Sequence, residues 1–145
     1  MFKQITVFLE NKPGRMVEVT GCLADSGINL HALTIADTAD FGILRIIVSD
    51  TEKAVRVLKE NGFMVKTTDV LAITMGNKPG CLYKVLKELN VLEVSIEYMY
   101  AFTSRHKDHD AIVILRLDNQ DAVIEKLKSG NFPMLEENLL EHLNE

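Results

Sequence analysis

The tetrapeptide Asn-Lys-Pro-Gly occurs twice in this chain of 145 residues, as Asn11–Gly14 and as Asn77–Gly80, and no other feature constrains the fold as strongly. The second copy begins 66 positions after the first, and the match continues on both sides of it. Each copy follows an apolar run of strand length and precedes the apolar spacing of an amphipathic helix. Because a long internal repeat indicates one structural unit used twice, we expect two domains of about 70 residues, residues 1–68 and residues 69–145.

The first repeat is predicted to fold in the order βαββαβ. Alternating apolar residues indicate a strand over residues 2–9, and the stripe Met16, Val19 and Leu23 indicates a helix that ends at Gly27. Turn residues and β-branched runs place the other elements: strands over 28–36, 43–48 and 63–67, and a helix from Asp50 or Thr51 to Asn61. This order is that of the ferredoxin-like plan, an α+β fold whose antiparallel sheet carries both helices on one face.

The second repeat is predicted to follow the same order, beginning with a strand over residues 71–75 and a helix with Val85 and Leu89 on its apolar face. It ends differently, because residues 136–143 have the apolar spacing of a terminal helix. No spacer separates the repeats, so residues 63–75 must hold two strands. We therefore expect the backbone to run nearly straight from one sheet into the next.

Composition excludes several classes of protein. No apolar run approaches the roughly 20 residues of a membrane span, and the first residues enter a strand without a secretory signal. The net charge of −5, with no cluster of basic and aromatic residues, argues against a nucleic-acid partner. Cys22 and Cys81 are isolated, which favours reduced thiols in a cytoplasmic protein.

The charged hairpin tip between residues 104 and 110 is the one candidate metal site. His106 and His109, with Asp108 and Asp110 beside them, are residue types that can bind a metal. A tip of this composition is more typical of a solvated turn. We therefore expect neither a metal nor a cofactor.

The Asn-Lys-Pro-Gly loops can bind a small anion. With Pro13 at the first helical position, Lys12 would stand at the cap, and lysine accepts no backbone hydrogen bond. The N–H groups of Gly14 and Arg15 would then be unpaired at the positive end of the helix dipole, where a carboxylate can dock. The alternative is ordinary turn chemistry, in which the asparagine side chain caps the helix. The duplication does not decide between the two interpretations.

The run that continues from the first loop resembles a known family. A strand, then Asn-Lys-Pro-Gly-Arg-Met (residues 11–16), a helix, Ser-Gly-Ile-Asn-Leu (residues 26–30) and a second strand are together similar to the ACT domain, the small-molecule regulatory module of amino-acid metabolism. The resemblance covers the whole chain as two such domains without a catalytic domain. A free-standing pair resembles uncharacterised ACT proteins and the regulatory subunits of acetolactate synthase.

The resemblance implies that an amino acid binds at an interface between two domains, against the loop after the first strand and the start of the second strand. The implied ligand-binding residues are Asn11, Pro13, Gly14, Arg15, Met16 and Asn29 in the first repeat and Asn77, Pro79, Gly80, Cys81, Leu82 and Ser95 in the second. Two departures weaken the equivalence of the second site. Ser95 stands in place of Asn29, and Glu93 stands in place of Gly27.

The favoured hypothesis is an amino-acid-binding regulatory protein that controls an enzyme of amino-acid metabolism. The alternative is a subunit of a biosynthetic enzyme, such as acetolactate synthase, that binds no ligand itself. No set of acid, base and nucleophile converges in the sequence, so we expect no catalytic activity. We also expect a homodimer, because an open sheet face or edge must be covered.

Overall fold

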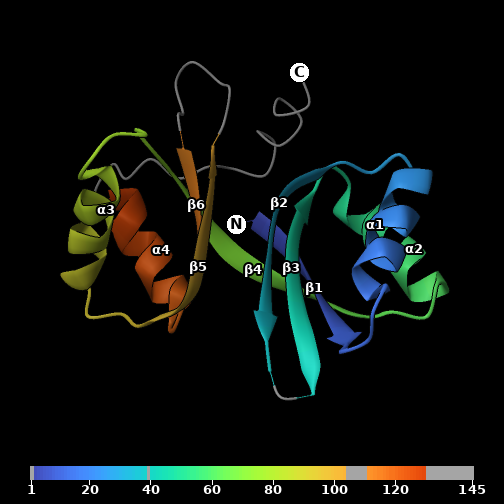
Figure 1. The fold of residues 1–145 in the computed structure, drawn as a ribbon. Coiled ribbons are helices and arrows are strands. Elements are labelled where there is room, and N and C mark those ends of the chain that lie inside the picture. The colour runs from blue at the N-terminus through green and yellow to red at the C-terminus, as the bar shows by residue number, and fades with distance from the viewer. Residues whose placement is uncertain (1, 39, 104–110, 130–145) are drawn as a thin grey trace. The chain divides into compact units, whose positions relative to one another are not determined.

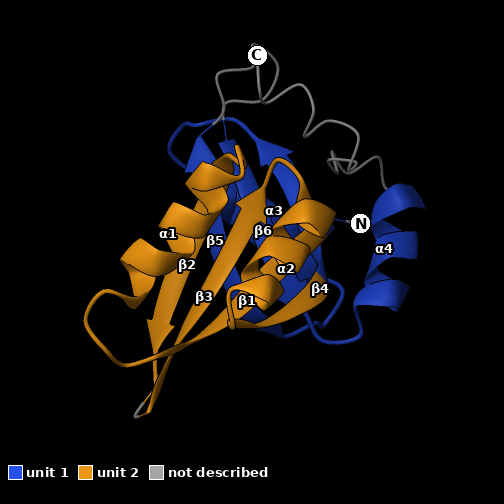
Figure 2. Cartoon of the chain, turned by 90° about the vertical axis from the view of Figure 1, so that its right-hand side faces the viewer, with its two compact units in different colours: residues 1–2, 69–143, 145 blue, residues 3–68, 144 orange. Residues whose placement is uncertain are grey.

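The computed structural model describes residues 2–38, 40–103 and 111–129, and it shows an α+β protein of six antiparallel strands and four helices within these ranges (Figure 1). The chain forms two compact units. The N-terminal unit comprises residues 3–68, and the C-terminal unit begins at Asp69 and also includes Phe2 (orange and blue in Figure 2). Within the described ranges, no helix is apolar enough over a sufficient length to span a membrane.

The N-terminal unit has the predicted βαββαβ order. Its elements are β1 (Phe2–Glu10), α1 (Arg15–Asp25), β2 (Leu30–Asp37), β3 (Phe41–Val48), α2 (Thr51–Glu60) and the beginning of β4 (Met64–Met75). The strand order is β2-β3-β1-β4, with β3 antiparallel to both β1 and β2. Both helices lie on one face of these strands (Figure 1), as the ferredoxin-like plan requires.

One apolar cluster holds the helices against the sheet. Alternate side chains of β1 and β3 face the helices, as the period of a strand dictates, and they meet the predicted helix stripes. The fully or almost fully buried members are Ile5, Val7, Leu9, Val19, Leu23, Leu44, Ile46, Val48, Ala54 and Leu58. Met16 is partly buried against the same cluster.

The second helix is capped as predicted. The Oδ1 of Asp50 accepts a hydrogen bond from the backbone N–H of Lys53 at 3.0 Å, and the helix ends at Asn61 before Gly62. An aspartate in this position satisfies one of the free N–H groups of the first turn. Asp50 is therefore the cap, and Thr51 is the first helical residue.

The C-terminal unit repeats the plan with its own core. Its elements are the end of β4, α3 (Cys81–Asn90), β5 (Ile96–Thr103), β6 (Ala111–Leu117) and α4 (Gln120–Ser129), in the strand order β4-β6-β5. Both helices again lie on one face of the strands (Figure 1). The buried cluster consists of Leu71, Ile73, Val85, Leu89, Val113, Leu115, Leu117, Val123 and Leu127.

The strand β4 is continuous from Met64 to Met75, so the last strand of one repeat and the first strand of the next are a single element. The expectation of one backbone run through residues 63–75 is therefore confirmed. The predicted terminal helix over residues 136–143 and the hairpin tip with its two histidines lie outside the described residues.

Candidate functional site

The start of α1 differs from the prediction. The helix begins at Arg15 with Gly14 as its cap residue, so Pro13 is not the first helical residue and Lys12 is not the cap. Gly14 has φ +87°, a left-handed conformation that glycine adopts without the cost it imposes on other residues. Gly80 caps α3 in the same way, with φ +89°. The prediction failed because the chain turns into the helix through the glycine and not through the proline.

Both helix starts are nevertheless open, which agrees with the first of the two interpretations of the loop sequence. Neither has a hydrogen bond from a capping side chain, so neither Asn11 nor Asn77 caps its helix. Among the described residues, no acceptor pairs with the N–H groups of Arg15, Met16 and Val17. A Cβ placed on Gly14 or Gly80 would meet no heavy atom within 4 Å. Each loop thus presents unpaired donors at the positive end of a helix.

Charged side chains surround the first loop and neutralise one another. The Nζ of Lys12 lies 2.7 Å from a carboxylate oxygen of Glu10, and the Nη1 of Arg15 lies 2.6 Å from Glu18. The hydrogen bond and charge of Lys12, followed by the charge of Arg15, lower the pKa of Glu10. The guanidinium of Arg15 also stacks over the ring of Phe63, 5.1 Å from its centroid. Arg15, predicted to bind ligand, is therefore already engaged within its own unit.

The second loop has a different charge pattern. At the 66-residue offset, Glu10 is replaced by Gly76, Arg15 by Cys81 and Glu18 by Lys84. Lys78 is kept from the first loop, and both it and Lys84 are exposed, with no acidic partner for either among the described residues. The backbone N–H of Cys81 donates to the carbonyl of Lys78 at 3.2 Å, leaving those of Leu82 and Tyr83 without an acceptor in the described part of the chain. This loop is consequently more positive than the first.

The residues predicted at the start of the second strand do not lie beside the loop of their own unit. Asn29 follows the C-terminal end of α1, whereas Gly14 precedes its N-terminal end, and a helix of 11 residues spans about 16 Å. Ser95 is related to Gly80 in the same way across α3. Both backbone groups of Asn29 are hydrogen bonded to Ser49, and both of Ser95 to Asp118, so only their exposed side chains are available.

The other predicted residues divide by exposure. Asn11, Pro13, Asn77 and Pro79 are exposed in the loops. Met16 and Leu82 are half-buried and pack on the cores of their own units. The half-buried thiol of Cys81 lies 3.3 Å from the position that a Cβ on Gly76 would occupy.

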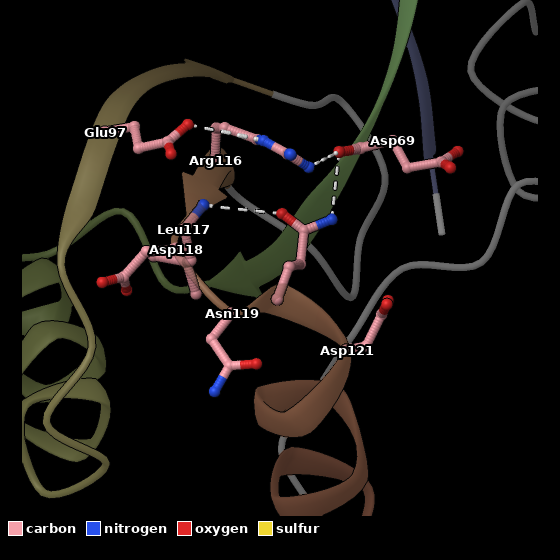
Figure 3. A pocket seen from close by; sticks show the side chains of 8 residues that line it. Asp69, Glu97, Arg116, Leu117, Asp118, Asn119 and Asp121 are labelled. Atoms are coloured by element: carbon pink, nitrogen blue, oxygen red, sulfur yellow. Dashed lines mark hydrogen bonds and ion pairs between the residues drawn. The ribbon is translucent and has the colours of Figure 1, made fainter.

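The structure also contains a hollow of about 430 Å³ in the C-terminal unit that the sequence did not indicate. Its lining is Asp69, Glu97, Arg116, Leu117, Asp118, Asn119, Gln120 and Asp121 (Figure 3). Arg116 and Gln120 both donate to the backbone carbonyl of Asp69, at 2.9 and 3.0 Å, and Arg116 is also 3.5 Å from Glu97. These side chains hold the backbone of β4 in place, so we assign them a structural role within this unit.

No group of three or more histidine, cysteine or acidic side chains within the described ranges has the arrangement of a metal site. The candidate ligands in the hairpin tip, His106 and His109 with their neighbouring aspartates, lie outside the residues that the structure describes.

Two comparisons concern sequence. The chain is 29% identical over 126 residues to the probable acetolactate synthase small subunit of Archaeoglobus fulgidus, which covers 82% of this chain and 79% of that one. It is 49% identical to protein BT0572 from Bacteroides thetaiotaomicron, whose crystal structure matches with a TM-score of 0.86 over 97% of this chain and 95% of that one.

A more distant structure shares the fold of this chain, and a match to a family model shows the family to which the chain belongs. The ligand-free regulatory subunit of aspartate kinase from Thermus thermophilus matches with a TM-score of 0.59 over 88% of this chain and 90% of that one, at 15% identity. The model of the ACT domain pair matches residues 1–144. Since this match spans both repeats, the chain belongs to the family of ACT domain pairs.

Proposed function

We propose that this protein is a non-catalytic regulatory sensor that binds an amino acid at its Asn-Lys-Pro-Gly loops and controls an enzyme of amino-acid metabolism. The observation that carries the proposal is the pair of open helix starts. Each has unpaired N–H groups, no capping side chain and free space beside its glycine. These are the features that a carboxylate requires at a helix N-terminus.

The first loop is better suited than the second loop to bind a zwitterionic amino acid. A free amino acid brings an ammonium as well as a carboxylate, and Glu10 and Glu18 stand beside the first helix start. The second loop has Gly76 and Lys84 in place of the acidic residues, so it favours the carboxylate and offers no acidic side chain to the ammonium. We therefore assign the amino acid to Gly14 and its neighbours first, and to Gly80 as a second, more anion-selective position.

A bound amino acid would need a second domain. Asn29 and Ser95 lie a helix length away from the loops of their own units, so an amide or hydroxyl from this position can reach a ligand at a loop only from another domain. A ligand held between two domains stabilises the arrangement in which both contact it. The regulated enzyme would respond to that difference in affinity between arrangements.

The proposal includes a cytoplasmic homodimer and a partner enzyme. The matched relative from Archaeoglobus fulgidus is named as a probable small subunit of acetolactate synthase, which supports a biosynthetic enzyme as the partner. The same match supports an alternative, in which the chain is a subunit of such an enzyme and binds no ligand itself. Ligand binding to the isolated protein separates the two functions.

The experiment measures binding of each of the twenty amino acids to the full chain by thermal shift and then by calorimetry. We expect one or a few to bind with dissociation constants on the order of micromolar to millimolar. Gly14→Val and Gly80→Val place a side chain over the helix starts, and the loss of more than about tenfold in affinity in one of them identifies the loop.

Gly62→Val is the matched control for backbone strain, because Gly62 has φ +83° and open space around it. It carries the same backbone strain and should bind the ligand as the wild type does. If no amino acid binds, or if both loop variants bind as Gly62→Val does, the sensor function is wrong. Copurification of a biosynthetic enzyme would then favour the alternative.

A further inference from the structure

The chain contains a single Asn-Gly pair, Asn61–Gly62, which lies at the C-terminal end of α2. Both residues are exposed to solvent. An asparagine that precedes glycine is chemically labile, because glycine has no side chain to obstruct attack by its own backbone nitrogen on the asparagine amide. Every other asparagine of the chain precedes a residue with a side chain. The sequence therefore singles out Asn61 as the candidate for spontaneous deamidation.

Deamidation at this pair is a hydrolysis in two steps. The backbone nitrogen of Gly62 bonds to Cγ of Asn61 while the Cγ–Nδ2 bond breaks, and Nδ2 leaves as ammonia with the proton that the glycine nitrogen gives up. The product is a five-membered succinimide ring, which water then opens. Cleavage between the glycine nitrogen and Cγ yields aspartate. Cleavage between that nitrogen and the backbone carbonyl carbon yields isoaspartate, in which the chain continues through Cγ.

The structure engages both reacting groups in other hydrogen bonds. The Nδ2 of Asn61 donates to the carbonyl of Val57 at 2.8 Å, and the backbone N–H of Gly62 donates to the carbonyl of Lys59 at 3.0 Å. Since the glycine nitrogen must give up its proton to attack, its hydrogen bond opposes the reaction. Both bonds have to break before the ring can close.

The backbone conformation of Asn61 opposes ring closure as well. Its ψ of +11° leaves the nitrogen of Gly62 nearly eclipsed with the backbone nitrogen of Asn61, whereas a five-membered ring requires it beside Cβ. Closure therefore needs the peptide plane to rotate about the Cα–C bond, which unwinds the end of the helix. The N–H of Phe63 donates to the carbonyl of Leu58 at 3.0 Å, and Phe63 is 6% exposed in the core of the unit. The residue after the pair thus resists this rotation.

We propose that Asn61 is a modification site that converts spontaneously to isoaspartate and aspartate, and that the C-terminal cap of α2 sets the rate. The reaction takes place in molecules whose residues 61–62 have left the helix end. Local opening of this kind requires less free energy than unfolding of the whole unit, so the modification proceeds in the native protein. It depends neither on binding of an amino acid nor on a partner enzyme.

The modification would weaken the end of α2. A carboxylate at position 61 cannot donate to the carbonyl of Val57, and its charge lies at the negative end of the helix dipole. Isoaspartate also inserts one methylene into the backbone before Gly62. The hydrogen bonds from Gly62 and Phe63 to the last turn of the helix then cannot both keep their geometry.

The effect would extend to the first Asn-Lys-Pro-Gly loop. The ring of Phe63 lies against the guanidinium of Arg15, whose carbon is 5.1 Å from the ring centroid. Arg15 in turn pairs with Glu18 at 2.6 Å and lies 3.8 Å from Glu10. Displacement of Phe63 would remove the support of Arg15. A modification at the end of α2 would thus alter a loop that is distant from it in the sequence.

The test follows deamidation of the full chain at mildly alkaline pH. Peptide mass spectrometry quantifies the exchange of an amide for a carboxyl at each asparagine, and an isoaspartate-specific methyltransferase with a labelled methyl donor identifies isoaspartate. We expect Asn61 to convert more than about tenfold faster than the other asparagines. In urea, which removes the cap, its conversion should be faster by a further factor of more than about ten.

Phe63→Leu and Leu89→Val separate local opening from a general loss of stability. Phe63→Leu weakens the anchor beside the cap without changing the reacting atoms, so Asn61 should convert several times faster. Leu89→Val changes the core of the C-terminal unit and is the matched control, which should convert at the rate of the wild type. Circular dichroism verifies that both variants are folded.

Three results would overturn the proposal. The first is conversion at Asn61 no faster than at the other asparagines. The second is an equal rate in buffer and in urea, because the fold would then not control the reaction. The third is an equal rate in Phe63→Leu and Leu89→Val, because opening would then not be local to the end of α2.

Discussion

The two units share their backbone geometry at equivalent turns and differ in the side chains that these turns carry. Gly14 and Gly80 cap their helices with φ angles of +87° and +89°. After each helix, the chain passes through one residue in a left-handed conformation, Gly27 with φ +68° and Glu93 with φ +53°. The duplicated geometry has therefore been kept even where the residue no longer favours it.

The side chains around the loops differ far more. In the first loop, acidic and basic side chains alternate and pair, as Glu10 does with Lys12. In the second loop the acidic positions hold Gly76 and Lys84. The repeat therefore identifies positions with the same backbone conformation, but it does not predict that the side chains at these positions bind the same ligand. Each loop has to be judged by its own charges.

The largest expected effect is a loss of stability when a buried side chain is removed from either core. It tests whether α1 and α3 contribute equally to the stability of their units. Leu23 and Leu89 occupy the same position in α1 and α3 and are 1% and 2% exposed. Leu23→Ala and Leu89→Ala should each lower the free energy of unfolding by about 2–5 kcal/mol, because each leaves a cavity beneath its helix. Urea denaturation measures both losses.

Tyr83→Ala serves as the control for helix propensity and side-chain loss at an exposed position, and it should change stability by no more than about 0.5 kcal/mol. Tyr83 is 68% exposed on the outer side of α3. A loss below about 1 kcal/mol for one of the two leucine variants would show that one helix packs less tightly than its repeat.

The next effect is a change in stability at Gly27 and Glu93, the residues with positive φ that follow the first helix of each unit. Exchanging glycine and a residue with a side chain should change the stability in opposite directions at the two positions. Glu93→Gly should stabilise the protein by up to about 1 kcal/mol, because glycine accepts a positive φ without the steric cost of a side chain. Gly27→Ala should destabilise it by about 1 kcal/mol for the same reason. Thermal and urea unfolding of each variant against the wild type measures the two changes.

The double variant, Gly27→Ala with Glu93→Gly, should return close to the stability of the wild type if the effects are local and additive. Destabilisation by Glu93→Gly would mean that the glutamate side chain contributes more than its backbone costs. That result would make position 93 a functional departure from the first repeat and not a tolerated one.

Much of the fold was predictable, because its determinants are periodic or local. The stripe of Val19 and Leu23 on α1 and that of Val85 and Leu89 on α3 identified the buried faces of two helices. The absence of a spacer indicated the single strand that the structure shows as β4. Asp50 indicated the start of α2, since an aspartate before an apolar stripe is a strong cap.

The details of the candidate site were less predictable. Proline at the first helical position is a common pattern, but here Gly14 is the cap residue, so the helix begins two residues later than predicted. The hollow near Arg116 could not be predicted, because it depends on contacts to the carbonyl of Asp69 from residues 47 and 51 positions away. The contact of Arg15 with Phe63 could not be predicted for the same reason. It joins segments that are distant in the sequence, and no periodic pattern indicates it.

The smallest effect concerns His31, whose counterpart in the C-terminal unit is Glu97. Burial lowers the pKa of His31, and its Nε2 is buried without a hydrogen-bond partner among the described residues. The folded state thus binds a proton less readily than the unfolded state, in which the histidine has a pKa of about 6.5. Stability should therefore fall as the pH is lowered through that value, because protonation then favours unfolding. The contribution should be less than about 1 kcal/mol, since a half-buried ring is partly screened by solvent.

Comparison with His31→Gln isolates this contribution, because the other histidines of the chain are present in both proteins and cancel in the difference. The free energy of unfolding of the wild type relative to the variant should decrease between about pH 7.5 and about pH 5.5. The wild type relative to Glu97→Gln should show no such loss over this range, because His31 is present in both of these proteins and its contribution cancels in the difference. A wild type that gains stability over the variant as the pH falls would mean that His31 acquires a partner for its proton, and the two units would then differ in electrostatics at the start of β2 and β5 as well as at their loops.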